Sequence, residues 1–225
     1  MIQVLRRPVW AIGTVICIAL VLLFVRLGMW QLDRLDERRE RNDRIESRME
    51  LPAEPVELVA EEYRRALVRG EWDDRGTVFI RSRSYGGRPG VHAVTPVVLD
   101  DGSAVLVNRG WVPEASAPPV EGPVALEGMV RATQERQGIG PRDPEEGELE
   151  QLARLEVQRI QQQYDRELLP FYVELQGEPG DSLPYPLPPP DLSEGPHLGY
   201  AGQWFIFAAI GAVGWVILLR RQRPA

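Results

Sequence analysis

The chain has 225 residues, 44% of them hydrophobic and 26% charged, and its formal net charge is −7. This length fits one or two domains, and the acidic balance argues against a nucleic-acid partner, which would need a concentrated positive surface. The single cysteine, Cys17, lies in an apolar run, so the remainder of the chain offers no disulfide and no thiolate metal site.

Two long apolar runs stand near the ends of the chain, over residues 9–25 and 200–219. As a helix, each is long enough to cross a hydrocarbon core about 30 Å thick. We therefore predict transmembrane helices over residues 9–29 and 199–219. The first run is longer than the usual core of a signal peptide and is not followed by a small-x-small cleavage site, so a retained anchor is favoured over a cleaved leader.

Arginines indicate the orientation of these two helices. Arg6 and Arg7 precede the first run, and Arg220 and Arg221 follow the second. The positive-inside rule then places residues 1–8 and 220–225 in the cytoplasm of a bacterial cell, with the central part outside the inner membrane. The arginines just beyond the first run oppose this orientation, but they alternate with acids and lead into a long translocated segment, where the charge bias has less force.

Residues 30–50 read as a charged helical extension of the first membrane helix, which stops before Pro52. The extension has only a thin apolar stripe, formed by Leu32, Leu35 and Ile45. This stripe favours a solvated connector over a helix that binds a partner.

Residues 51–176 read as an outward-facing β-rich domain. Short runs rich in branched residues are separated by turn residues, and Asp100, Asp101 and Gly102 predict a tight hairpin between two of the runs. An imperfect helical period over residues 145–168 predicts a helix that packs on the sheet, and residues 171–175 read as a last strand. The expected fold class is membrane α+β, in which two terminal transmembrane helices flank an antiparallel sheet or a small barrel with a packed helix.

Residues 177–198 are dominated by proline and glycine. Such a composition cannot build a packed core, so we expect an extended arm that returns the chain to the membrane.

Two histidines, the only ones in the chain, are candidates for chemistry. His92 lies in a predicted strand and is interpreted as a partly buried residue whose ring bonds to a backbone group. His197 immediately precedes the second apolar run, and Tyr200, Ala201 and Trp204 follow on its helical face. This face suits the edge of a haem, for which histidine is a usual axial ligand. An interfacial belt of aromatic residues explains the same pattern.

Arg109, Gly110 and Trp111 form a further cluster at the end of a predicted strand. The arginine can pair with a carboxylate such as a haem propionate while the indole packs beside it. A purely structural pair at a strand end explains the cluster equally well. A Ser-His-acid set drawn from Ser82 or Ser103 shows no activated serine, so we expect no enzyme active site.

Four segments of the sequence resemble the surfeit-locus-one family of cytochrome c oxidase assembly factors. They follow the family's order and span nearly the whole chain between the two apolar runs. They are residues 27–34 (Leu-Gly-Met-Trp-Gln-Leu-Asp-Arg), 68–71 (Val-Arg-Gly-Glu), the predicted hairpin over 90–113 with its Asn-Arg-Gly-Trp-Val-Pro, and 196–205 (Pro-His-Leu-Gly-Tyr-Ala-Gly-Gln-Trp-Phe).

The resemblance implies a non-catalytic factor that assists the delivery of haem a into the catalytic subunit of a haem–copper oxidase. Bacterial relatives are described as haem a binders with a histidine at the second helix, which maps to His197 as ligand of the haem iron. Trp30, Tyr200 and Trp204 would then form walls, and Arg109 would meet a propionate. The expected partners are the catalytic subunit, haem a synthase and the lipid bilayer. A membrane scaffold that binds these proteins without binding haem is the alternative.

Overall fold

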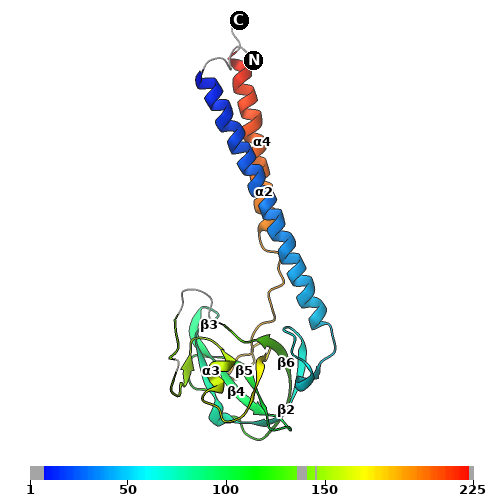
Figure 1. Cartoon of the computed structure of the whole chain (residues 1–225), viewed down its shortest axis with the longest axis vertical. Coiled ribbons are helices and arrows are strands. Elements are labelled where there is room, and N and C mark those ends of the chain that lie inside the picture. Colours follow the sequence, from blue (N-terminus) through cyan, green and yellow to red (C-terminus); the bar gives the residue numbers. More distant parts are fainter. Residues whose placement is uncertain (1–7, 136–140, 145, 223–225) are drawn as a thin grey trace. The chain divides into compact units, whose positions relative to one another are not determined.

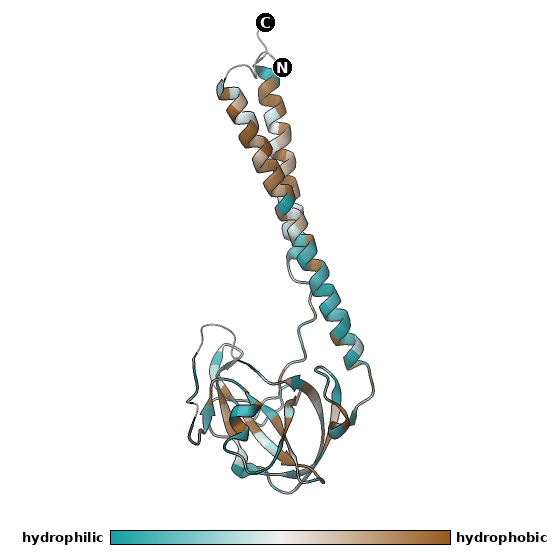
Figure 2. Cartoon of the chain, viewed as in Figure 1, coloured by the Kyte–Doolittle hydropathy of each residue, from teal (hydrophilic) through white to brown (hydrophobic). Residues whose placement is uncertain are grey.

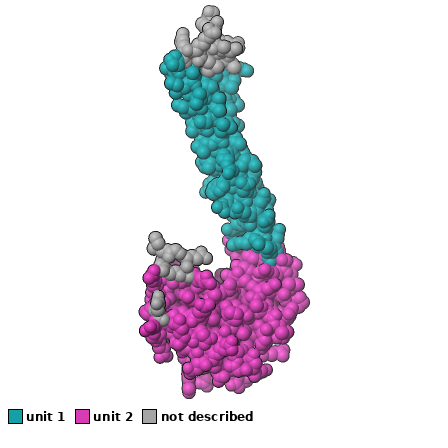
Figure 3. Space-filling view, in the orientation of Figure 1, with its two compact units in different colours: residues 1–44, 192–225 teal, residues 45–191 magenta. Residues whose placement is uncertain are grey.

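The computed structural model describes residues 8–135, 141–144 and 146–222 and divides into two compact units (Figures 1 and 3). The helical unit comprises residues 1–44 and 192–225, and the barrel unit comprises residues 45–191. The predicted cytoplasmic ends, residues 1–8 and 220–225, consist largely of residues 1–7 and 223–225, which lie outside the described residues.

Two helices build the helical unit. α2 (Pro8–Met49) is one continuous helix of 42 residues, and α4 (His197–Arg221) has 25 residues. By length and composition both are able to cross a membrane. In Figure 2 the first half of α2 and most of α4 are apolar, whereas the second half of α2 is hydrophilic. The predicted charged extension is therefore helical and continuous with the first apolar run.

Small residues let the two helices approach closely. A Cβ atom on Gly28 of α2 would lie 2.6 Å from the ring of Phe205 in α4, so only glycine fits there. Nearer the other end of the pair, the rings of Trp10 and Trp215 lie 5.9 Å apart. The helices thus pack along their length through ring-to-backbone and ring-to-ring contacts.

A closed ring of five strands forms the centre of the barrel unit. The ring order is β2–β6–β8–β5–β4, and pairing of β4 with β2 closes it. β3 continues the sheet beyond β4, β7 pairs with β3, and β1 pairs with β2. The strands are β1 (Glu54–Pro55), β2 (Arg65–Trp72), β3 (Val78–Tyr85), β4 (Arg88–Val98), β5 (Ala104–Val112), β6 (Pro123–Ala132), β7 (Gln151–Leu152) and β8 (Leu168–Glu174).

The predicted strands and the hairpin between β4 and β5 are confirmed, and the alternative of a small barrel is the correct one. The expectation of a purely antiparallel sheet is wrong, because β5 pairs with β8 in parallel. A parallel pair requires a long crossover, and the chain between these two strands provides one by passing through β6 and the segment that follows it.

Branched side chains fill the inside of the ring and cover part of its outside. The inner core consists mainly of valines, among them Val68, Val97, Val107 and Val173. A second cluster joins the outer face of β3, β4 and β5 to the segment around Leu155 and the short helix α3 (Val157–Gln161). Two 3₁₀ turns, η1 (Val56–Leu58) and η2 (Asp74–Gly76), precede β2 and β3.

The helix predicted over residues 145–168 is wrong, except for the five residues of α3. Side chains of other segments take the backbone N–H groups that such a helix would use. The Asp143 carboxylate accepts from Ala153 N at 2.8 Å, and Gln134 Oε1 accepts from Leu155 N at 3.2 Å. Such side-chain bonds compete with helix formation. Residue 145 lies outside the described residues.

The proline-rich arm is only partly an extended connector. Its first part pairs with the barrel, where Tyr185 exchanges two backbone hydrogen bonds with Trp111, at 2.8 and 2.9 Å. Leu187 N also donates to Leu175 O at 2.9 Å. The composition did not indicate that the arm would add backbone pairing to the sheet.

Candidate functional site

His197 is the first residue of α4, and its ring reaches α2. Its Nδ1 atom lies 2.8 Å from Oε1 of Gln31, and the ring is half-buried. An amide oxygen only accepts, so the imidazole donates from Nδ1. The neutral ring then carries its proton on Nδ1 and leaves the Nε2 lone pair available. This is the arrangement found for histidines that bind a metal through Nε2 while a carbonyl holds the other nitrogen.

The aromatic residues predicted near His197 have different surroundings. Trp30 follows Met29 at the end of the apolar half of α2, and the guanidinium of Arg34 lies 5.7 Å from its ring centroid. Trp30 and Tyr200 are 43% and 47% exposed, so both offer ring surface to a ligand or to lipid. Trp204 instead stacks on Phe24 of α2 at 5.6 Å. Within the described part of the chain, no ring contact joins Trp30, Tyr200 and Trp204 to one another.

The segment just before His197 is held against α2 by polar side chains. Arg39 forms a bidentate pair with Glu194, at 2.7 and 3.0 Å. Arg38 Nε donates to Ser193 O at 2.7 Å. The buried amide of Asn42 donates to Leu192 O at 2.5 Å. These bonds give the charged extension a definite role that the solvated-connector interpretation missed, because they fix the chain that leads into α4.

Arg109 belongs to the barrel unit. Its side chain is only 7% exposed, and its guanidinium donates to Thr95 Oγ1 at 3.4 Å and to Pro118 O at 2.7 Å. The guanidinium also lies 5.9 Å from the ring centroid of Trp72. Burial lowers its pKa, against a weaker opposing effect of Asp74. Every contact found for Arg109 is thus internal to the barrel unit, and the expected propionate contact stays a prediction.

His92 lies on β4 and is half-buried, as the sequence predicts, but its ring bonds to a side chain and not to the backbone. Nδ1 lies 3.4 Å from Nδ2 of Asn108 on β5. Burial, together with the positive charge of Arg83, lowers the pKa of His92 to about 4. The imidazole is therefore neutral near pH 7.

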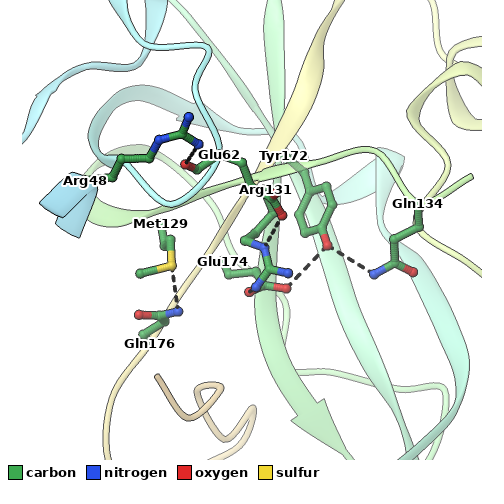
Figure 4. A network of polar contacts seen from close by, with 8 residues as sticks. All are labelled: Arg48, Glu62, Met129, Arg131, Gln134, Tyr172, Glu174 and Gln176. Carbon is green, nitrogen blue, oxygen red and sulfur yellow. Dashed lines mark hydrogen bonds and ion pairs between the residues drawn. The ribbon is translucent and has the colours of Figure 1, made fainter. Parts of the chain in front are cut away.

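A polar network links β6 and β8 to the segment before β2 (Figure 4). The buried carboxylate of Glu174 on β8 accepts from Arg131 Nη1 at 3.2 Å and from the Tyr172 hydroxyl at 3.4 Å. Arg131 Nε also donates to Glu62 at 3.1 Å, and Glu62 O accepts from Arg48 at 3.0 Å. Burial raises the pKa of Glu174, although the charge of Arg131 acts in the opposite direction. Arg131 is therefore paired with two carboxylates, those of Glu62 and Glu174.

The sequence places Gln31 beside Trp30 at the outer end of the first apolar run, but it assigns Gln31 no role of its own. It stands in the segment over residues 27–34, directly after Trp30, but nothing in a single sequence shows that its amide meets a histidine 166 positions away. Among the described residues, no group of three or more His, Cys, Asp or Glu side chains is arranged to hold a metal ion. A single imidazole suits only a metal that already carries most of its ligands.

The fold defines a class of protein: a small β-barrel domain joined at both ends to helices that are long and apolar enough to cross a membrane. Residues 18–209 match the model of the SURF1 family. A SURF1-like protein of Monosiga brevicollis is 30% identical over 87% of this chain and 83% of its own length. The chain therefore belongs to the SURF1 family.

Other relatives carry the same family name. Human Surfeit locus protein 1 is 34% identical, over 57% of this chain and 54% of its own length. An uncharacterized SURF1-like protein of Mycobacterium bovis is 26% identical over 93% of this chain and 83% of its own length. The chain thus spans about half the length of the human relative but most of the bacterial one.

Proposed function

We propose that this protein is a non-catalytic, membrane-anchored assembly factor for haem–copper cytochrome c oxidase, and that it holds haem a for delivery to the catalytic subunit. Membership of the SURF1 family supports the role in oxidase assembly. The haem part of the proposal rests on the hydrogen bond between His197 and Gln31, because that bond leaves Nε2 of the imidazole free to bind iron.

The residues around His197 fit a haem. The macrocycle supplies four of the iron's ligands, so one imidazole suffices on the protein side. When bound, the haem would supply its iron as the acceptor of the Nε2 lone pair. The exposed rings of Trp30 and Tyr200 offer flat apolar surface. The exposed guanidinium of Arg34 lies beside Trp30 and is paired with Glu37 at 2.7 Å, so it would have to exchange this partner to meet a propionate. Gln31 would hold the imidazole in one tautomer and one orientation.

The proposal includes a location and partners. Both apolar helices would span the inner membrane of a bacterial cell, with both termini in the cytoplasm and the barrel unit outside it. The catalytic subunit of the oxidase would receive the haem, and a haem a synthase would supply it. The length and apolar composition of the two helices and the existence of a bacterial relative support this location.

One observation favours the scaffold alternative. Trp204 packs on Phe24 inside the helix pair, so its stacking contributes to helix packing whether or not a haem binds. The exposed Trp30 and Tyr200 are also what an interfacial belt needs at the headgroup level. In that alternative the protein binds the oxidase subunit or the synthase without holding haem.

The visible spectrum of the protein, purified from cells that make haem a, separates the two functions. We expect haem a bands in the wild type, their loss in His197→Ala, and wild-type bands in His92→Gln, which removes the chain's other histidine. Haem content that His197→Ala leaves unchanged would overturn the ligand assignment. Absence of haem from all three proteins, with the oxidase subunit still co-purifying, would establish the scaffold.

A further inference from the structure

Two β-bulges turn side chains of three neighbouring strands to one face of the barrel unit. In the first, Ile80 of β3 faces His92 of β4, but Arg83 faces Gly90, so β3 has one extra residue between these pairs. Ile80 and Arg83 are three positions apart and would point to opposite faces of a regular strand. The bulge, at which Ser82 has a φ of +60°, places Arg83 on the face of His92.

The second bulge lies on the other side of β4. Ala93 faces Gly110 of β5, whereas Val94 faces Asn108, so Arg109 is the extra residue. This shift places Trp111 directly opposite His92, on the face that also carries Asn108. Bulges often re-aim side chains beside functional sites. Here two of them flank His92 and bring an arginine and a tryptophan to its face.

Arg83 has no carboxylate partner in the part of the chain that the structure describes. Its half-buried guanidinium donates to Arg81 O at 3.3 Å and to Gln134 Oε1 at 3.2 Å, and these acceptors are neutral. Glu174 exerts some attraction, but its carboxylate is bonded to Arg131. Burial lowers the pKa of Arg83. A half-buried guanidinium without a paired carboxylate can bind an anion favourably, because the ion pair offsets part of the desolvation cost of the arginine.

His92 presents a donor and not an acceptor to this face. Asn108 Oδ1 accepts from Gly110 N at 3.2 Å, which fixes the orientation of the amide and leaves Nδ2 to donate to His92 Nδ1. The neutral imidazole then carries its proton on Nε2. The pKa of about 4 keeps the ring in this form near neutral pH.

Trp111 supplies a third donor. Its side chain is only 3% exposed, and its Nε1 atom has no hydrogen-bond partner among the described residues. Nε1 lies over Gly90, where a Cβ would approach it to 2.4 Å. The guanidinium of Arg88, an exposed residue, is 5.6 Å from the indole centroid and adds positive charge. A buried indole N–H without an acceptor lowers the stability of the folded protein, so a hydrogen bond from this N–H to a bound anion would be favourable.

We propose that Arg83, His92 and Trp111 form an oxyanion-binding site on the barrel, which takes a carboxylate or phosphate group. The guanidinium provides charge and a planar pair of donors, and the imidazole and indole provide one N–H each. This site lies in the barrel unit, and the inference does not depend on the haem proposal.

Histidine NMR of the full chain in detergent provides a direct test, because only two histidines contribute signals. Sodium acetate and sodium phosphate are titrated against sodium chloride at equal ionic strength. We expect a saturable shift of the His92 signal with both oxyanions, an increase of about 1 unit or more in its pKa, and no change at His197. Arg83 is the charged group that acts on the pKa of His92, and Asn108 bonds to its ring. Glu174 of β8 is paired with Asn108 in the sheet register, and Arg88 lies over Trp111, so both charges are included in the analysis of the titration.

Matched variants identify the donors. Arg83→Gln should weaken anion binding at least tenfold and Trp111→Phe, which keeps a ring, should weaken it several-fold. Arg81→Gln, in the same bulge but paired with Asp143, should bind as the wild type does. If Arg83→Gln also lowers the thermal midpoint of unfolding, the anion affinity of Trp111→Phe provides the test instead. A His92 shift that fails to saturate, that chloride reproduces, or that both variants retain would refute the site.

A further arm of the same titration distinguishes an acidic protein segment from a small free anion as the natural ligand. A hexaglutamate peptide is compared with acetate at equal carboxylate concentration. Tighter binding of the peptide by tenfold or more identifies an acidic protein segment as the ligand, and equal binding identifies a small free anion. Both outcomes support the site, whereas absence of binding by peptide, acetate and phosphate overturns it.

Discussion

Gly110 provides the sharpest test of how the arm is attached to the barrel. Its φ is +121°, and a Cβ at this position would lie 2.0 Å from Tyr185 O. Gly110→Ala therefore strains the backbone, at a cost of about 1–3 kcal/mol. It also displaces the two hydrogen bonds between Trp111 and Tyr185, each worth about 0.5–1.5 kcal/mol. The expected loss of unfolding free energy is about 2–6 kcal/mol.

Urea unfolding monitored by tryptophan fluorescence measures this loss, since Trp111 stacks on Tyr185 at 5.9 Å. Gly102→Ala is the matched control. Gly102 also has a positive φ, +88°, but open space surrounds it at the tip of an exposed hairpin. Its replacement should cost only the backbone strain, about 1–2 kcal/mol. Equal losses in the two variants would show that the arm's pairing with β5 contributes nothing to stability.

Further predictions follow from the contacts of single side chains. Gln31→Leu should weaken haem binding about 10–100-fold, because it frees the imidazole of His197 to rotate. Gln203→Leu, on the exposed surface of α4, is the control and should bind haem as the wild type does. Equal haem spectra for the two variants would refute the role of Gln31. Burial raises the pKa of Glu174 in the folded state, so the wild type should lose stability as the pH rises above 4.5 and this carboxyl ionises. Glu174→Gln cannot ionise, and its stability should fall less steeply over the same pH range. An unchanged slope of urea midpoint against pH contradicts it. Asn42→Ala should make residues 192–194 more sensitive to protease, since their buried anchor is lost.

The strands could be predicted because their sequence pattern is local. Each run of branched residues bounded by turn residues became a strand, and the Asp-Gly step between β4 and β5 became a hairpin. Closure of the ring could not be predicted in this way. It depends on the pairing of Glu71 and Trp72 with the end of β4, a contact set by the twist of the whole sheet.

The failed helix over residues 145–168 shows a different limit. Leu152 and Ile160 are buried, as an apolar helical face requires, but Leu152 is buried by pairing with Ile80 as a short strand. The periodicity therefore identified buried residues correctly while giving the wrong backbone. The deciding groups, Asp143 and Gln134, lie outside the helical pattern and take the N–H groups at 153 and 155.

The sequence selected individual candidate residues near α4 but could not predict their contacts. Helical spacing placed Tyr200 and Trp204 after His197, yet the structure gives these residues different roles. Trp204 packs on Phe24, Tyr200 stays exposed, and His197 bonds to Gln31. Contacts between two helices depend on their relative rotation, which a single sequence does not provide.

The family-like segments coincide with the places where the backbone or the packing departs from regular geometry. Residues 90–113 contain the bulge at Arg109, the positive φ of Gly110 and the close approach of Gly90 to the indole of Trp111. Residues 27–34 contain Gln31, which bonds to His197 in the segment over 196–205. Regular strands and helices tolerate many sequences, whereas a bulge or a glycine contact accepts few. The bulge at Arg109, inside one of these segments, places Trp111 opposite His92, whereas Arg83 reaches the same face through the bulge in β3, outside them.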